Sequence, residues 1–155
     1  MDRTKMTAAA AAAMLLFACG RSPGQADAQA DYTIKGTDGA TAHITAGGPA
    51  AAAAMPAFAP LYPGATIESS MTGAGAAGAG GMVIFRTGAA PAQVVEFYKG
   101  RAAAAGFGNV FSSENGDGLM LTAGKEGAED SFNVTARPDD KTTTVVLTWT
   151  DPKKG

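Results

Sequence analysis

Cys19 is the residue of this chain best suited to chemistry, and it is the only cysteine among 155 residues. A thiolate is a soft nucleophile that is alkylated readily, which a serine hydroxyl cannot match. The cysteine follows a basic N-terminus and an apolar run from Met6 to Ala18. This order predicts an export signal over residues 1–18. The run is shorter than the roughly 20 residues that a membrane-spanning helix needs.

The residues around Cys19 resemble the lipobox of bacterial lipoproteins, with Leu16 at −3, Ala18 at −1 and Cys19 at +1. The resemblance implies cleavage before Cys19, diacylglycerol on its sulfur, and a further acyl chain such as palmitate on the new amino group. Two or three chains make such an anchor stable, because each buried methylene contributes about 0.8 kcal/mol. The same resemblance, with Gly20 rather than aspartate at +2, implies the outer membrane, facing the periplasm. The alternative is an incidental thiol in a signal peptide that is cleaved elsewhere, for instance after Ala26 or Ala30.

No pattern of residues after Cys19 indicates a catalytic site as clearly as the lipobox residues indicate acylation. His43 is the only histidine, and no G-x-S-x-G motif offers it a nucleophile, so we expect an ordinary strand histidine. Paired carboxylates can act without histidine. The candidate acids are scattered or fall in turns, where we expect solvent exposure: Glu68, Glu96, Glu114, Glu126, Glu129, Asp130, Asp139 and Asp140. We therefore predict no catalytic residue and no enzyme, with a small periplasmic hydrolase using carboxylates or His43 as the alternative.

Cofactor and metal sites are not expected either. Residues Gly73 to Gly78 match G-x-G-x-x-G, but a strand follows them where the dinucleotide fingerprint needs a helix. The segment from Glu114 to Gly118 lacks the spacing of a calcium loop, so we expect a hairpin turn. The formal net charge of −2, without a clustered basic surface, argues against nucleic acid. We predict no nucleotide, no cofactor and no metal ligand.

The elements before the main domain are small. Residues 19–30 are small and polar, which predicts a flexible tether. Two alternating segments flank Asp38-Gly39, a tight-turn pair, and predict a β-hairpin over residues 31–46. Residues 47–60 form an Ala/Pro/Gly-rich linker with room for at most one helical turn. Residues 151–155 are expected to be a solvated tail.

The main domain is expected over residues 61–150. Met82 to Thr87 predicts a strand after a loose Gly/Ala loop from Thr72 to Gly81. Pro91 predicts a helix start and Gly106 its left-handed end. Further strands are expected over residues 107–113, 119–123, 131–137 and 142–150. Consecutive strands after one helix predict an α+β fold: an antiparallel β-sheet with one main α-helix packed on one face, preceded by the β-hairpin and the tether.

The aromatic side chains have two interpretations. They are either the core of a small domain, which we favour, or the lining of a pocket for an apolar ligand. The residues concerned are Phe85, Phe97, Tyr98, Phe107, Phe111, Phe132 and Trp149.

The body of the chain also resembles small, uncharacterised bacterial envelope lipoproteins and secreted proteins. The resemblance rests on residues 62–65, on the strand at 83–87, on residues 95–98 and on Gly106. These are turn, strand and helix signals, so they imply a fold and no reaction. We predict a lipid-anchored envelope protein, facing the periplasm, that acts as a non-catalytic binding or assembly module with a possible envelope protein partner. A carrier of an apolar ligand is a further alternative.

Overall fold

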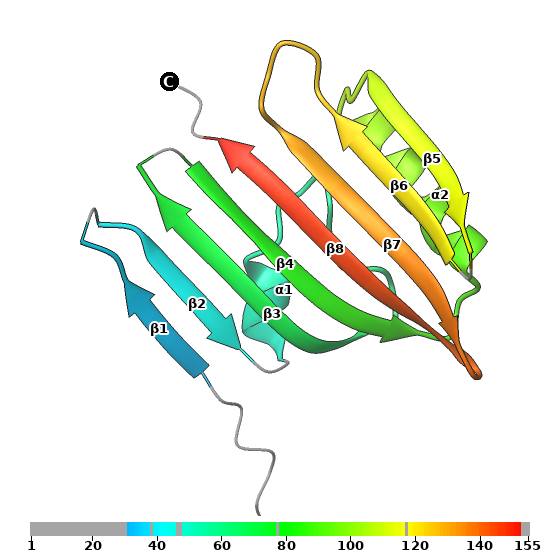
Figure 1. Cartoon of the computed structure of the whole chain (residues 1–155), viewed down its shortest axis with the longest axis horizontal. Coiled ribbons are helices and arrows are strands. Elements are labelled where there is room, and N and C mark those ends of the chain that lie inside the picture. The colour runs from blue at the N-terminus through cyan, green and yellow to red at the C-terminus, as the bar shows by residue number, and fades with distance from the viewer. Residues whose placement is uncertain (1–30, 38, 46–47, 77, 117, 153–155) are drawn as a thin grey trace, which may run out of the picture.

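The computed structural model describes residues 31–152, apart from 38, 46–47, 77 and 117 (Figure 1). The expected signal peptide, Cys19 and the tether at 19–30 lie outside the described residues, as do the last three residues of the tail. Among the described residues, no helix is both long and apolar enough to cross a membrane.

One antiparallel sheet organises the whole fold. Its eight strands lie in the order β1-β2-β3-β4-β8-β7-β6-β5, and each pairs antiparallel with its neighbours. This arrangement, with one main helix packed against the sheet, confirms the α+β class. The strands are β1 (Asp31–Lys35), β2 (Thr41–Thr45), β3 (Thr66–Gly75), β4 (Gly78–Thr87), β5 (Asn109–Asn115), β6 (Gly118–Gly124), β7 (Ser131–Asp139) and β8 (Thr142–Pro152).

The N-terminal hairpin of β1 and β2 is continuous with the main sheet. β2 pairs with β3, with Thr41 opposite Ala74 and Thr45 opposite Ser70. The short helix α1 (Pro49–Ala53) follows and packs against β3. Ala59, later in the same Ala/Pro/Gly-rich segment, is fully buried in the core. The described part of this segment, residues 48–60, therefore covers part of the sheet as well as leading toward β3.

The expected loop from Thr72 to Gly81 is wrong, because β3 continues to Gly75 and β4 begins at Gly78. Glycine and alanine are disfavoured in strands. Here β3 and β4 form a hairpin, and β2 and β8 pair with its two outer sides. The glycine at position 81 also has a packing reason. A Cβ added there would lie 2.6 Å from the ring of Trp149, its partner on β8, so only glycine leaves room for the indole.

The helix α2 (Pro91–Ala104) begins and ends much as predicted. Pro91 occupies the first turn, and the Gln93 side chain accepts a hydrogen bond from the Ala90 N–H at 3.0 Å. At the other end Gly106 has a φ of 76°, and the Phe107 N–H donates to the Ala102 carbonyl. This is a Schellman ending. It turns the chain sharply so that Phe107 reaches the core.

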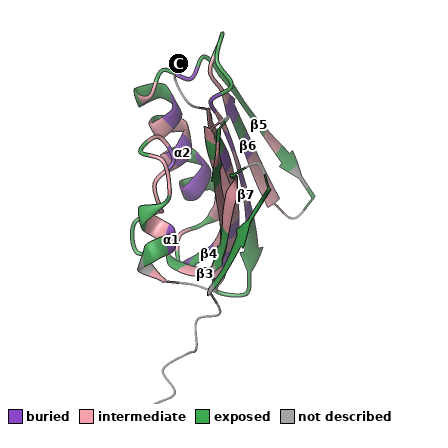
Figure 2. Cartoon of the chain, turned by 90° about the vertical axis from the view of Figure 1, so that its left-hand side faces the viewer, coloured by how far each residue is buried: buried purple, intermediate pink, exposed green. Residues whose placement is uncertain are grey.

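Both helices lie on the same face of the sheet (Figure 2). The buried side of α2 packs on β6 and β7 through Val94, Val95, Tyr98 and Ala102. The Tyr98 hydroxyl donates to the Pro60 carbonyl at 2.8 Å, which fixes the segment before β3 against the helix. Burial of this hydroxyl raises the pKa of Tyr98 above its ordinary 10.0.

Most of the aromatic side chains form the core, as favoured from the sequence. The rings of Phe107 and Phe132 meet edge to face, with their centroids 5.3 Å apart. Phe97 is partly buried beside this cluster. Phe111 differs, because it is 64% exposed on β5. The buried members of the set are Phe85, Tyr98, Phe107, Phe132 and Trp149.

Candidate functional site

His43 lies exposed on β2, where its Nδ1 is 3.1 Å from the hydroxyl of Thr33 on the neighbouring strand. Within the described part of the chain, no ion pair joins it to a carboxylate. The glycines of the G-x-G-x-x-G match lie in β3 and at the start of β4, so no helix N-terminus faces them. Among the residues that the structure describes, no three His, Cys, Asp or Glu side chains gather as a metal site.

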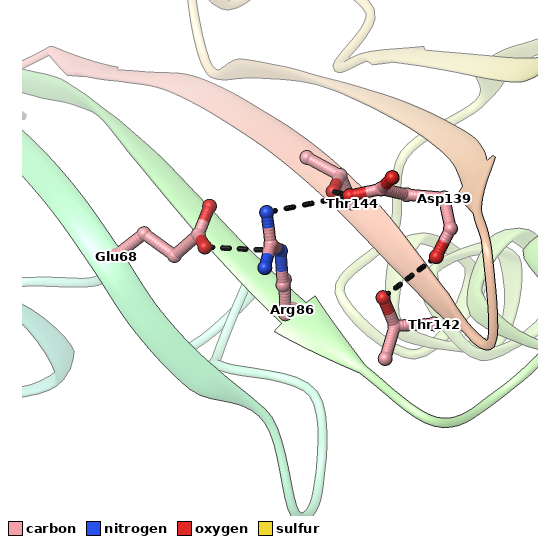
Figure 3. Close-up of polar contacts among 5 residues, drawn as sticks. All are labelled: Glu68, Arg86, Asp139, Thr142 and Thr144. Atoms are coloured by element: carbon pink, nitrogen blue, oxygen red, sulfur yellow. Dashed lines mark hydrogen bonds and ion pairs between the residues drawn. The ribbon is translucent and has the colours of Figure 1, made fainter.

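Two of the candidate acids belong to an ion-pair network on the sheet. Arg86 Nε is 3.0 Å from Glu68 Oε1, and Arg86 Nη2 is 3.3 Å from Asp139 Oδ2 (Figure 3). The hydroxyl of Thr144 donates to the same Asp139 oxygen at 3.2 Å. The network joins β3, β4 and β7, and its charged groups pair with one another. Because these side chains are about half exposed to solvent, the ion pairs add little stability. It leaves no obvious demand for a ligand.

A different pocket lies at the C-terminal end of α2, and sheet register explains how it forms. Ala123, Phe132 and Trp149 face one another across β6, β7 and β8 and are buried beneath the helix layer. Side chains two positions further along a strand point to the same face. Two residues beyond this row stand Lys125, Asp130 and Asp151. All three line one pocket with Arg101 and Ala104 of α2, which places them on the helix side of the sheet, next to the ends of β6 and β7.

This pocket, hereafter the α2 pocket, has a volume of about 360 Å³. Its charged lining consists of Arg101 from α2 together with Lys125, Asp130 and Asp151. The segment before β3 and the end of the helix supply an apolar wall: Pro56, Ala57, Phe58, Ala104, Ala105 and Phe107. Ligand sites commonly combine such a wall with a few converging polar groups.

Two buried polar atoms in the α2 pocket have no hydrogen-bond partner among the described residues. They are Asp130 Oδ1 and Arg101 Nε. Asp130 as a whole is only 6% exposed. The Arg101 guanidinium does bind elsewhere, since its Nη2 donates to the Ala57 carbonyl and ties the apolar segment to the helix. Buried polar atoms are nearly always paired in folded proteins, so an unpaired acceptor and an unpaired donor in one pocket point to a missing partner.

The electrostatics of the pocket are balanced. Two basic side chains, Arg101 and Lys125, oppose two acidic ones, Asp130 and Asp151. The pocket also adjoins the last turn of α2, where the helix dipole places partial negative charge. The arrangement can hold a ligand that has both a donor and an acceptor.

Sequence reasoning placed Asp130 in an exposed connection, and this prediction is wrong because its side chain is buried. The same expectation is confirmed for Glu126, Glu129, Asp139 and Asp140, which are exposed. Arg101, Lys125 and Asp151 were not recognised as candidates. The available signal was the two-residue step from Phe132 to Asp130 and from Trp149 to Asp151, which keeps each acid on the face of a core aromatic residue.

Comparison with known proteins identifies the family of this fold. A family model described as START domain-like matches residues 67–150. The chain belongs to the START domain-like family. The matched residues run from β3 to β8 and include α2. They contain three of the four charged residues of the α2 pocket and also Phe107. Asp151 and residues 56–58 of the pocket lie outside the match. Membership of the START-like family fits a binding module. Neither the comparison with curated proteins nor that with solved structures found a match.

Proposed function

We propose that this protein is a lipid-anchored, non-catalytic envelope protein whose START-like domain binds a small, partly apolar ligand in the α2 pocket. The observation that carries the binding role is the buried, unpaired Oδ1 of Asp130 beside an aromatic wall. A binding module is also what the family match favours. Among the roles expected from the sequence, the carrier is therefore preferred to the assembly module, and its site is the α2 pocket.

Lipid anchoring is a separate part of the proposal and rests on Cys19 alone. The lipobox resemblance supports acylation of Cys19 and attachment to the outer membrane, facing the periplasm. Metabolic labelling with palmitate tests it in wild type and Cys19→Ser. We expect label and membrane fractionation in the wild type only. A Cys19→Ser protein that still incorporates palmitate and stays with the membrane would refute the anchor.

Native mass spectrometry tests the carrier role. The full chain, isolated from its own cells in a mild detergent, should retain an additional small-molecule mass. Ala104 lines the pocket, is exposed and lies in the last turn of α2, so Ala104→Trp should block the pocket without disturbing the core. Ala103→Trp is the matched control, because Ala103 is exposed in the same turn and does not line the pocket. The additional mass should disappear only in Ala104→Trp.

A protein without an additional mass in any variant argues against the carrier. Crosslinking in intact cells then separates the remaining roles, because recovery of one discrete protein partner would favour the assembly module. The hydrolase is the second candidate, because Asp130 and Asp151 bring two carboxylates into one pocket. It predicts that the retained molecule is converted to a product of different mass on incubation. A carrier returns the molecule unchanged.

A further inference from the structure

We propose that the α2 pocket recognises the zwitterion of an α-amino acid with an apolar side chain, with the ammonium group at Asp130 and the carboxylate at Arg101. This inference rests on the proposed function and deepens it, because it names the chemical class of the ligand. Its first basis is the opposite character of the two unpaired atoms. Arg101 Nε is a donor and Asp130 Oδ1 is an acceptor, and both are buried in the same pocket.

The two side chains do not satisfy each other. No ion pair joins Arg101 to Asp130, although ion pairs within 4.0 Å are found elsewhere in the described part of the chain. The arginine instead uses Nη2 to hold the Ala57 carbonyl, and this contact fixes the direction of the guanidinium. One ligand that offers an acceptor to Arg101 and a donor to Asp130 would satisfy both atoms.

Ionic groups on the ligand fit these two partners better than neutral ones. A hydroxyl or an amide also combines a donor with an acceptor, but a buried carboxylate is costly unless an opposite charge compensates it. Hydrogen bonds between ionised groups are roughly twice as strong as neutral ones. The two basic and two acidic side chains of the lining balance, so the preferred ligand is neutral overall and carries both charges.

The apolar wall of the pocket indicates that the rest of the ligand is an apolar side chain. The rings of Phe58 and Phe107 lie with their centroids 5.2 Å apart at an angle of 56°, and both line the pocket. Burial of an apolar side chain against these rings favours binding. The volume of about 360 Å³ lies at the small end of ligand sites, which suits an amino acid better than a long acyl chain.

Calorimetric titration of the full chain in a non-ionic detergent tests the inference with four probes. L-leucine carries all three recognised features. N-acetyl-L-leucine lacks the ammonium, L-leucinamide lacks the carboxylate, and glycine lacks the apolar side chain. We expect L-leucine to bind most tightly. Each of the other probes should bind about 10-fold more weakly or worse, because each leaves a buried charge unpaired or the aromatic wall uncovered.

Matched variants connect the binding to the two side chains. Asp130→Asn should weaken L-leucine binding about 10-fold or more and remove the preference over N-acetyl-L-leucine. Arg101→Gln should likewise weaken L-leucine binding and should remove the preference for L-leucine over L-leucinamide. Circular dichroism checks that both variants remain folded. The controls Asp140→Asn and Arg137→Gln change the same residue types at exposed positions outside the pocket and should leave binding unchanged.

Several results would overturn the inference. One is equal binding of L-leucine and N-acetyl-L-leucine to the wild type, and another is L-leucine binding that Asp130→Asn leaves intact. If no probe binds while native mass spectrometry shows a retained molecule that Ala104→Trp displaces, the inference fails and the proposed function stands. If no probe binds and no molecule is retained, both fail.

Discussion

Asp130→Asn should make the protein more stable, which is the opposite of what most substitutions at buried positions do. The side chain is 6% exposed, and its Oδ1 has no partner among the described residues. A buried polar group without a partner costs about 1–3 kcal/mol, and more when it is charged. Asparagine has nearly the same shape and removes the charge. We therefore expect the free energy of unfolding to rise by about 1–2 kcal/mol, equivalent to roughly 3–5 °C in Tm per kcal/mol for a domain of this size.

Urea unfolding measures this change directly. Trp149 is the only tryptophan and is 5% exposed, so its fluorescence reports the loss of the core. Asp140→Asn is the control, because Asp140 is exposed in a turn with a φ of 52° that asparagine tolerates. It should change the free energy of unfolding by less than about 0.5 kcal/mol. A loss of stability in Asp130→Asn would show that the carboxylate is paired in the free protein, and the argument for a missing ligand would fall.

Two further predictions concern the core. Tyr98→Phe removes a buried hydroxyl that donates a hydrogen bond, so the free energy of unfolding at pH 8 should fall by about 1 kcal/mol. Because the pKa of Tyr98 is raised above 10.0 in the folded protein, tyrosine ionises above pH 10 in the unfolded chain but not in the folded one. The variant should therefore lose less stability above pH 10 than the wild type does. Urea unfolding at both pH values checks this against the exposed control Tyr32→Phe, and an unchanged alkaline profile would contradict it. Gly81→Ala should lower the free energy of unfolding by about 1–3 kcal/mol, since the new Cβ would lie 2.6 Å from the Trp149 ring. Gly88→Ala, which meets nothing within 4 Å, should unfold like the wild type, and equal stability of the two alanine variants would refute the packing argument.

The helix and the C-terminal strands were predictable because their signals are local. Pro91 and Gly106 mark the two ends of α2, and the apolar spacing between them identifies the face that packs on the sheet. The strands after α2 carry β-branched and aromatic residues between turns. These properties depend on neighbours in sequence, so no knowledge of the sheet order is needed to see them.

The Gly/Ala hairpin and the pocket depended on contacts that span long distances in the sequence. Residues 72–81 have few side chains to indicate a strand. The parts of this segment that lie in β3 and β4 pair with β2 on one side and β8 on the other. Likewise, Arg101 meets the Ala57 carbonyl 44 residues away. Asp130 and Asp151 approach one another because β7 pairs with β8. Considered alone, the turn-forming residues around Asp130 predict that its side chain is exposed. The side chain is buried, in a pocket that it lines together with residues of α2.

The position of β1 has a mechanical consequence. The chain enters the sheet through its outermost strand, which five residue pairs with β2 hold in place. A pull from the N-terminal side therefore loads these bonds first, while α2 and the α2 pocket rest on strands in the other half of the sheet. Opening these bonds would expose the edge of β2, whose backbone groups could then pair with another chain. The N-terminal hairpin therefore lies between the point where the chain enters the sheet and the strands next to the α2 pocket.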